Sequence, residues 1–225
     1  MELNNEKIIL DLCGGTGSWA RPYKEAGYKV ITITFPKYNV LNYIIAGNLI
    51  YFESSDYHLK IDMNKIHGVL AAPPCTMFSD ARTNAKTPRD LRGGMQTVIA
   101  CLDIIHQIQY RTKTDQQKTS PLKFWALENP FYGRLKWFLG NPIFTFDPWE
   151  FGDNYKKRTA LWGYFKPPVK THLDVLEVMT NSRALPKFDK MESKNIHPEF
   201  FGKLDRQARR SITPAGFANA FFKAN

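Results

Sequence analysis

The sequence predicts an α/β fold in which several strands end at polar or glycine-rich elements. The chain opens with a short apolar run, 7–12, that enters a glycine-rich turn, 13–18. A stretch with helical spacing, 19–27, and a strand rich in β-branched residues, 29–34, complete a strand–helix–strand unit. In open α/β sheets, ligands bind beyond the carboxyl ends of the strands. We therefore expect the polar elements to converge on one cleft.

The later elements follow from apolar periodicity and turn residues. Residues 41–66 are interpreted as an insertion, with strands at 49–52 and 58–61 forming a hairpin that turns at 54–56. The remaining predictions are a strand at 67–72, a basic loop at 76–93, a helix at 94–109, a strand at 124–127, a short helix at 132–139, a strand at 159–164 and a terminal helix at 214–222.

Composition narrows the functional classes. A chain of 225 residues suits one α/β domain with a small appended lobe. Its net charge of +10 favours a polyanionic partner such as DNA, although the same charge can serve solubility alone. Three widely spaced cysteines form no CxxC pair, which argues against a disulfide framework or a metal cluster. Reduced thiols, and the absence of a signal peptide or apolar span, predict a cytoplasmic protein.

The glycine-rich turn is a candidate ligand loop. Asp11 precedes it, and the residues Cys13, Gly14, Gly15, Thr16 and Gly17 form it. Glycines allow a close backbone approach, and the following helix N-terminus can hold a carboxylate such as that of a methionine moiety. The motif is not GxGxxG, which weakens a dinucleotide interpretation. A plain tight turn is the alternative.

A thiol follows the strand at 67–72. Pro73 and Pro74 stiffen the chain before Cys75, so this cysteine is held in a fixed position after a buried strand. A lone cysteine is more often inert, and reactivity requires thiolate character from nearby cations or backbone N–H groups. The candidate cations are Arg82, Arg89 and Arg92.

Three further groups of polar residues lie later in the chain. The first group is Glu128, Asn129 and Pro130, which follow the strand at 124–127. The Glu128 carboxylate at the end of this strand can hydrogen-bond the edge of a flipped base or simply be solvated. Basic residues also cluster in two places, where they contact nucleic acid or form a solvated face. These residues are Lys156, Lys157 and Arg158, and then Arg206, Arg209 and Arg210.

Taken in order, from Ile9 to about Phe222, these motifs resemble those of the C5-cytosine DNA methyltransferase family. The similar blocks are Asp11 to Gly17 (cofactor loop), Pro74-Cys75-x-x-Phe78-Ser79 (catalytic signature), Asp90-x-Arg92-Gly93, Glu128-Asn129, Lys157-Arg158 near the family's pair of arginines, and Ser211-Ile212-Thr213-Pro214 with Ala218 and Ala220 (terminal block).

The resemblance implies a doubly wound, mostly parallel, seven-stranded Rossmann-like methyltransferase sheet with helices on both faces. It implies a catalytic and cofactor-binding domain at 1–165, a small recognition lobe at 166–207 and a segment at 208–225 that packs back on the domain. We expect a monomer that acts on cytosine-containing DNA, with S-adenosyl-L-methionine as cofactor and no metal.

The resemblance also implies roles for individual residues. Cys75 is the nucleophile that attacks carbon 6 of cytosine, Glu128 stabilises the adduct, and Arg158 orients the base. The implied cofactor residues are Asp11, Cys13, Gly14, Gly15, Thr16, Gly17, Trp19, Thr34, Asn39, Val40, Pro73, Ser211 and Thr213. The implied DNA or base contacts are Ser79, Arg82, Arg89, Arg92, Asn129 and Lys157.

The departures from the family pattern keep alternatives open. The acidic residue with which the family holds the cofactor's ribose is missing, and Thr34 lies at that position. The aspartate that usually contacts the adenine is represented by Asn39 or by Asp62. Ala160 replaces the second arginine, and the recognition stretch after Arg158 is short. Substrates such as RNA, single-stranded DNA or a cytosine nucleotide are therefore alternatives. So are a non-catalytic nucleic-acid-binding relative and an oxidoreductase with a nicotinamide cofactor.

Overall fold

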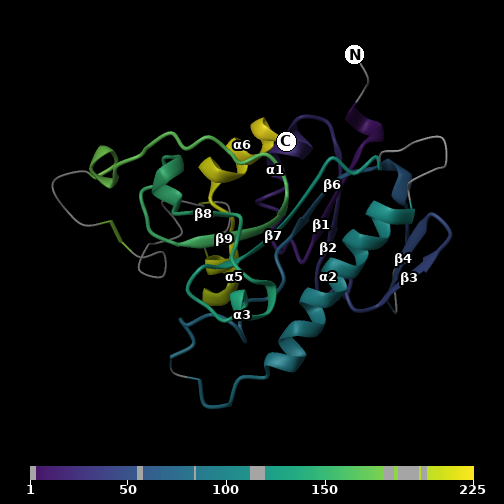
Figure 1. The fold of residues 1–225 in the computed structure, drawn as a ribbon, viewed down its shortest axis with the longest axis horizontal. Helices are drawn as coiled ribbons and strands as arrows, with labels where there is room; N and C mark the ends of the chain where they lie inside the picture. The colour runs from purple at the N-terminus through teal and green to yellow at the C-terminus, as the bar shows by residue number, and fades with distance from the viewer. Residues whose placement is uncertain are drawn as a thin grey trace.

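A six-stranded sheet forms the centre of the molecule (Figure 1). The computed structural model describes residues 4–54, 58–83, 85–111, 120–179, 185–186, 198 and 202–225. The strands of the central sheet are β1 (Ile8–Leu12), β2 (Lys29–Ile33), β6 (Ile66–Ala71), β7 (Phe124–Pro130), β8 (Phe144–Phe146) and β9 (Thr159–Tyr164). Their order across the sheet is β2-β1-β6-β7-β9-β8.

The predicted α/β class is confirmed, and the strand count differs from the expectation. The pairs β1–β2, β1–β6 and β6–β7 are parallel, whereas β7–β9 and β8–β9 are antiparallel. The sheet is thus mixed and mostly parallel. Within the described residues it has six strands rather than the seven that the resemblance implied.

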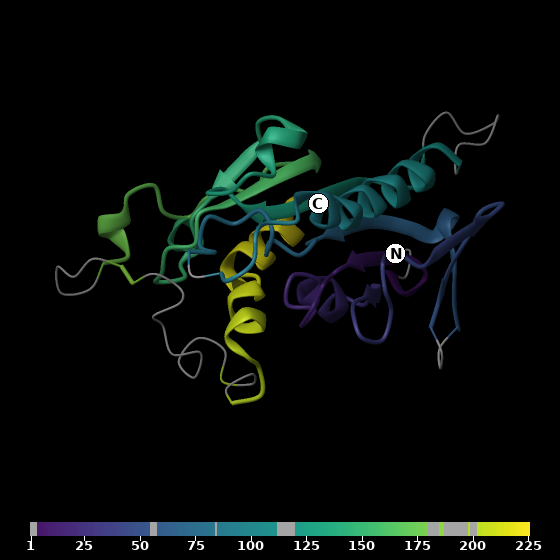
Figure 2. The ribbon, with the colours of Figure 1, turned by 90° about the horizontal axis from the view of Figure 1, so that it is seen from below.

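Helices cover both faces of this sheet (Figure 2). On one face α2 (Leu91–Arg111) packs through a buried apolar stripe against β1, β6 and β7. On the other face α1 (Arg21–Glu25) and α6 (Ala215–Ala224) contact each other and bury an aromatic cluster. The two-faced arrangement follows from strands such as β1, whose five residues are all buried.

The predicted insertion is a small antiparallel sheet of β3 (Tyr43–Ala46), β4 (Leu49–Glu53) and β5 (His58–Asp62). The hairpin between the two predicted strands is confirmed, while residues 55 and 56 of its predicted turn lie outside the described residues. β3 was not predicted from the sequence, because it is only four residues long and half of them are exposed.

The short elements complete the described chain. They are η1 (Asn4–Glu6), η2 (Met63–Lys65), α3 (Lys136–Leu139), η3 (Pro148–Phe151), η4 (Val175–Glu177) and α5 (Arg206–Ser211). The predicted helices at 19–27 and 132–139 are shorter than expected, whereas α2 starts three residues earlier, where the Asp90 carboxylate accepts the Gly93 N–H. Most of the predicted lobe at 166–207 beyond residue 179 lies outside the described residues. In the described chain, no helix has the length and apolar character needed to cross a bilayer.

Replacing Phe217 with alanine is expected to cost about 3–5 kcal/mol of unfolding free energy. The Phe217 ring is fully buried, stacks on Phe146 with centroids 3.9 Å apart, and also contacts Trp19. Urea denaturation followed by circular dichroism measures the loss. Phe35→Ala is the control, because this ring is exposed and its removal is expected to change stability by less than about 0.5 kcal/mol.

Candidate active site

The carboxyl ends of strands β6 and β7 bring a thiol and a carboxyl group to the same edge of the sheet. The two strands are parallel, with Ala71 opposite Leu127, so Cys75 and Glu128 both lie just beyond this point. The Asn129 side chain links β7 to the segment that follows β6, since its Nδ2 donates to the Pro73 carbonyl at 3.0 Å. Asn129 is buried, and this bond ties the proline pair to β7.

The backbone around Cys75 is held by a tight turn. The Cys75 carbonyl accepts from the N–H groups of Phe78 (2.9 Å) and Ser79 (2.8 Å). Arg89 Nη1 donates to the Met77 carbonyl at 2.9 Å, and Ser79 forms an isolated antiparallel bridge with Gly133. The thiol therefore has a fixed position relative to both strand ends.

Four titratable side chains interact electrostatically here, and we call them the thiol cluster: Cys75, Glu128, Lys157 and Arg210. Burial raises the pKa of Cys75 and the charge of Glu128 adds to this, while Lys157 and Arg210 oppose it. Burial also raises the pKa of Glu128, against the effect of Lys157. Burial lowers the pKa of Lys157 and Arg210 lowers it further, while Glu128 and Cys75 oppose this shift. With Glu128 protonated, the cluster holds two cations that favour a nearby anion, such as the Cys75 thiolate.

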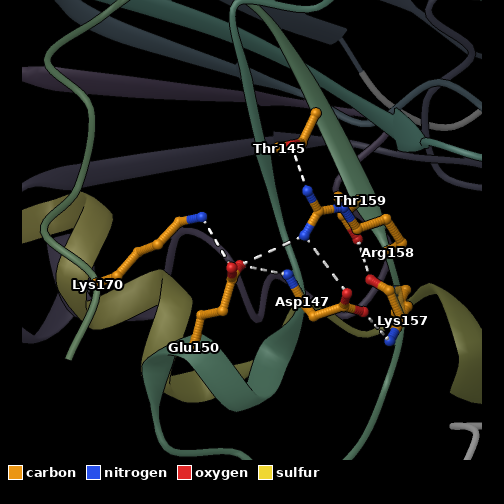
Figure 3. A network of polar contacts seen from close by, with 7 residues as sticks. All are labelled: Thr145, Asp147, Glu150, Lys157, Arg158, Thr159 and Lys170. Carbon is orange, nitrogen blue, oxygen red and sulfur yellow. Dashed lines mark hydrogen bonds and ion pairs between the residues drawn. The ribbon is translucent and has the colours of Figure 1, made fainter. Parts of the chain in front are cut away.

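The structure brings Lys157, but not Arg158, into this cluster. Lys157 Nζ donates to the Ile212 carbonyl at 3.0 Å. The guanidinium of Arg158 instead donates to Thr145 Oγ1 at 2.8 Å and pairs with Asp147 and Glu150 at 3.5 and 3.8 Å (Figure 3). Neighbouring side chains in an extended chain point to opposite sides, so one of the pair faces the thiol and the other faces away.

The network around Arg158 fixes the backbone of Lys157 (Figure 3). Asp147 Oδ1 accepts the Lys157 N–H at 3.0 Å, and Thr159 Oγ1 donates to the Lys157 carbonyl at 2.7 Å. Glu150 caps the same turn by accepting the Asp147 N–H at 2.7 Å and pairs with Lys170 at 2.8 Å. Burial raises the pKa of Asp147, and the charge of Arg158 opposes this shift. Arg158 thus favours the charged form of the carboxylate that holds the Lys157 backbone.

The glycine-rich turn lies over a buried acid. Asp11 is 1 % exposed, and burial raises the pKa of its carboxyl group to about 7 although Thr32 bonds it. A Cβ atom on Gly14 would meet Asp11 Oδ2 at 2.0 Å, so only glycine fits there. Asp11 Oδ1 has no hydrogen-bond partner among the described residues. Gly15 and Gly17 have φ of 55° and 70°, which favours glycine, and space beside Gly17 is open.

The terminal block lies between this turn and the thiol cluster. Thr213 N donates to Ser18 Oγ at 2.9 Å, and Ser211 Oγ would lie 3.9 Å from a Cβ on Gly15. Lys157 bonds Ile212 from the other side. The terminal block therefore contacts the end of the glycine-rich turn on one side and Lys157 of the thiol cluster on the other.

Other predicted cofactor residues divide into two groups. Thr34, Asn39 and Val40 follow the carboxyl end of β2, on the edge that holds the glycine-rich turn. Asp62 instead precedes η2 at the amino end of β6, where its side chain accepts the Asn64 N–H. Asn39 is thus the better placed of the two alternatives. Trp19 is 2 % exposed and packs against Phe217 and Phe221 in the aromatic core rather than on an open surface.

The predicted nucleic-acid contacts also differ in their surroundings. Ser79 Oγ accepts the Ala81 N–H within its own turn, and Arg82 bonds Pro88 O and Thr87 within the 76–93 loop. Arg92 is exposed, whereas Arg89 braces the turn after Cys75. None of these three arginines is among the groups that shift the pKa of Cys75. The cations that lower this pKa are Lys157 and Arg210, and Arg210 was predicted only as part of a basic cluster of undetermined role.

Opposite shifts in thiol reactivity are expected from two substitutions in the cluster. Glu128→Gln removes a charge that raises the pKa of Cys75, so iodoacetamide should label Cys75 several-fold faster near neutral pH. Lys157→Met removes a charge that lowers this pKa, so labelling should slow several-fold. Mass spectrometry of the Cys75 peptide measures both rates across pH.

Arg92→Met is the matched control for this experiment. It removes an exposed cation of the loop near Cys75 and should leave the labelling rate unchanged. If Glu128→Gln and Lys157→Met both raised or both lowered the labelling rate of Cys75, the electrostatic arrangement of the cluster would be contradicted.

The comparisons with known proteins add no family to this geometry. The chain matches no model of a protein family, and the search of curated proteins gives no match either.

Proposed function

We propose that this chain is an S-adenosylmethionine-dependent methyltransferase that acts on carbon 5 of cytosine in nucleic acid through a covalent adduct with Cys75. The observation that supports it most is the thiol cluster, in which a positioned cysteine and a half-buried glutamic acid interact at one strand edge. The motifs of the C5-cytosine DNA methyltransferase family, present in order, support the same assignment.

The residues around the glycine-rich turn fit the cofactor. Asp11 Oδ1 is a buried acceptor without a partner in the described chain, which suits the amino group of a methionine moiety. Space beside Gly17 is open at the same turn, and the Ser211 hydroxyl lies beside Gly15. When bound there, the cofactor supplies an electrophilic methyl group on a sulfonium.

The side chains of the thiol cluster then perform the steps on the base. The Cys75 thiolate adds to carbon 6 of cytosine, and the electrons of the carbon 5–carbon 6 double bond become available at carbon 5. Burial raises the pKa of Glu128, and in its protonated form this carboxyl group donates to the ring nitrogen and stabilises the adduct. Lys157, rather than Arg158, takes the place of a base-contacting cation. After methylation, the carbon 5 proton passes to water, and the electrons of that C–H bond re-form the carbon 5–carbon 6 double bond as the Cys75 thiolate leaves.

Covalent trapping tests the proposal. An oligonucleotide with 5-fluorocytosine lacks the carbon 5 proton, so the adduct cannot break down after methylation. With cofactor present, we expect a stable protein–nucleic acid complex on a denaturing gel, and no complex with Cys75→Ser. Single-stranded DNA, duplex DNA, RNA and a free cytosine nucleotide are assayed in parallel, because the segment between Arg158 and the terminal block is short.

The outcomes separate the alternatives. Nucleic-acid binding without an adduct on any substrate would favour a non-catalytic relative. Calorimetric binding of a nicotinamide dinucleotide in preference to S-adenosylmethionine would favour the oxidoreductase and would overturn the proposal.

A further inference from the structure

Exposed aromatic rings gather in the segment that follows β7. Tyr132 is 65 % exposed, Trp137 is 69 % exposed and Phe138 is 47 % exposed, and they lie within seven consecutive residues. Single exposed apolar side chains are common on protein surfaces, but several large rings in one short segment mark an interaction surface.

This segment is fixed to the turn that holds Cys75. Arg134 N donates to the Phe78 carbonyl at 3.0 Å, and Asp80 N donates to the Tyr132 carbonyl at 3.1 Å. The Arg134 guanidinium pairs with the Asp80 carboxylate at 2.6 Å, and the Phe78 ring contacts Phe138 edge to face at 6.3 Å. The segment that carries the rings is therefore anchored beside the proposed active site, at the same edge of the sheet.

Cations alternate with these rings. The Arg134 guanidinium lies 5.4 Å from the centroid of Trp137, and Lys136 Nζ lies 5.0 Å from the centroid of Phe131. The Arg134 charge is already paired with Asp80, so Lys136 is the cation of this segment that is placed to meet a phosphate. Flat exposed rings with interleaved cations match the way proteins hold unpaired nucleotides, by stacking on bases and pairing with the backbone.

We propose that Tyr132, Arg134, Lys136, Trp137 and Phe138 form a platform that binds single-stranded nucleic acid next to the target base. A duplex hides the faces of its bases in the stack, whereas a single strand offers them to aromatic rings. The net charge of +10 complements such a polyanion. The platform rests on the proposed function only in its position next to a target base, because stacking itself requires no catalysis.

Binding of fluorescein-labelled oligonucleotides, followed by anisotropy without cofactor, tests the platform. The same sequence is used as single-stranded DNA, single-stranded RNA and duplex DNA. We expect the full chain to bind at least one single strand more tightly than the duplex. Trp137→Ala should weaken that binding about fivefold or more, and Trp137→Phe should retain most of it.

A pair of tyrosines gives a matched control. Tyr132 on the platform and Tyr164 at the opposite edge of the sheet, 65 % and 68 % exposed, are each replaced with alanine. A loss of single-strand affinity in Tyr132→Ala alone supports the platform. Equal losses in both variants, or unchanged affinity in Trp137→Ala, overturn it. If trapping with 5-fluorocytosine fails while these losses are seen, the proposed function fails and the platform stands; the reverse pattern rejects the platform alone.

Discussion

Cys75→Ser is expected to lower the rate of methyl transfer on the order of 1,000-fold or more. Serine has nearly the same size, so the turn that holds residue 75 should persist. Its hydroxyl, however, loses a proton far less readily than a thiol, and the two cations of the thiol cluster cannot make up that difference. Transfer of a tritiated methyl group from the cofactor to a cytosine-containing strand measures the rate.

Two controls separate chemistry from folding in this variant. Cofactor affinity by calorimetry and the midpoint of thermal unfolding should stay close to those of the unaltered chain. Cys101→Ser replaces a buried thiol in α2 that interacts with Cys13 and lies outside the cluster, and it should keep most of the activity. Retention of a tenth of the rate in Cys75→Ser would rule out a covalent mechanism through this residue.

The sequence predicted the fold where the signal was local. β1, β2 and β9 are short apolar runs with turn residues beside them, and β9 has the predicted bounds of Thr159–Tyr164. The order of strands in the sheet could not be predicted from the sequence. β9 joins the sheet antiparallel to β7 and brings the three-residue β8 with it, and such pairing depends on long-range contacts rather than on periodicity.

The residues of the site likewise divide into those that local sequence signals predict and those that only long-range contacts bring together. Cys75 and Glu128 were predictable because each follows or ends a buried strand, and parallel strands bring their carboxyl ends together. The choice between Lys157 and Arg158 was not predictable, because the pair precedes β9 and the sequence does not state which of the two faces the thiol. Arg210 lies on a six-residue helix distant in sequence, and only tertiary structure brings its charge to Cys75.

Gly14→Ala is expected to disable the cofactor loop. The added Cβ would meet three atoms of the Asp11 carboxyl group within 2.4 Å, and Asp11 is too deeply buried between strands to move away. Overpacking of this kind costs about 1–3 kcal/mol of stability. A displaced loop should also reduce methyl transfer about a hundredfold, because a shift of about 1 Å in a binding element is enough for such a loss.

Gly93→Ala is the matched control for this clash. Its Cβ would meet Asp90 Oδ2 at 2.2 Å, but Asp90 is exposed and can rotate into solvent, at the cost of its bond to the Gly93 N–H. We expect a loss of about 1 kcal/mol and little change in cofactor binding. The double variant Asp11→Ala/Gly14→Ala should be more stable than the sum of the single effects allows, because the first change removes the atoms that the second would strike. Additive losses of stability, or unchanged cofactor affinity in Gly14→Ala, would show that the buried acid and the glycine above it do not act as one unit.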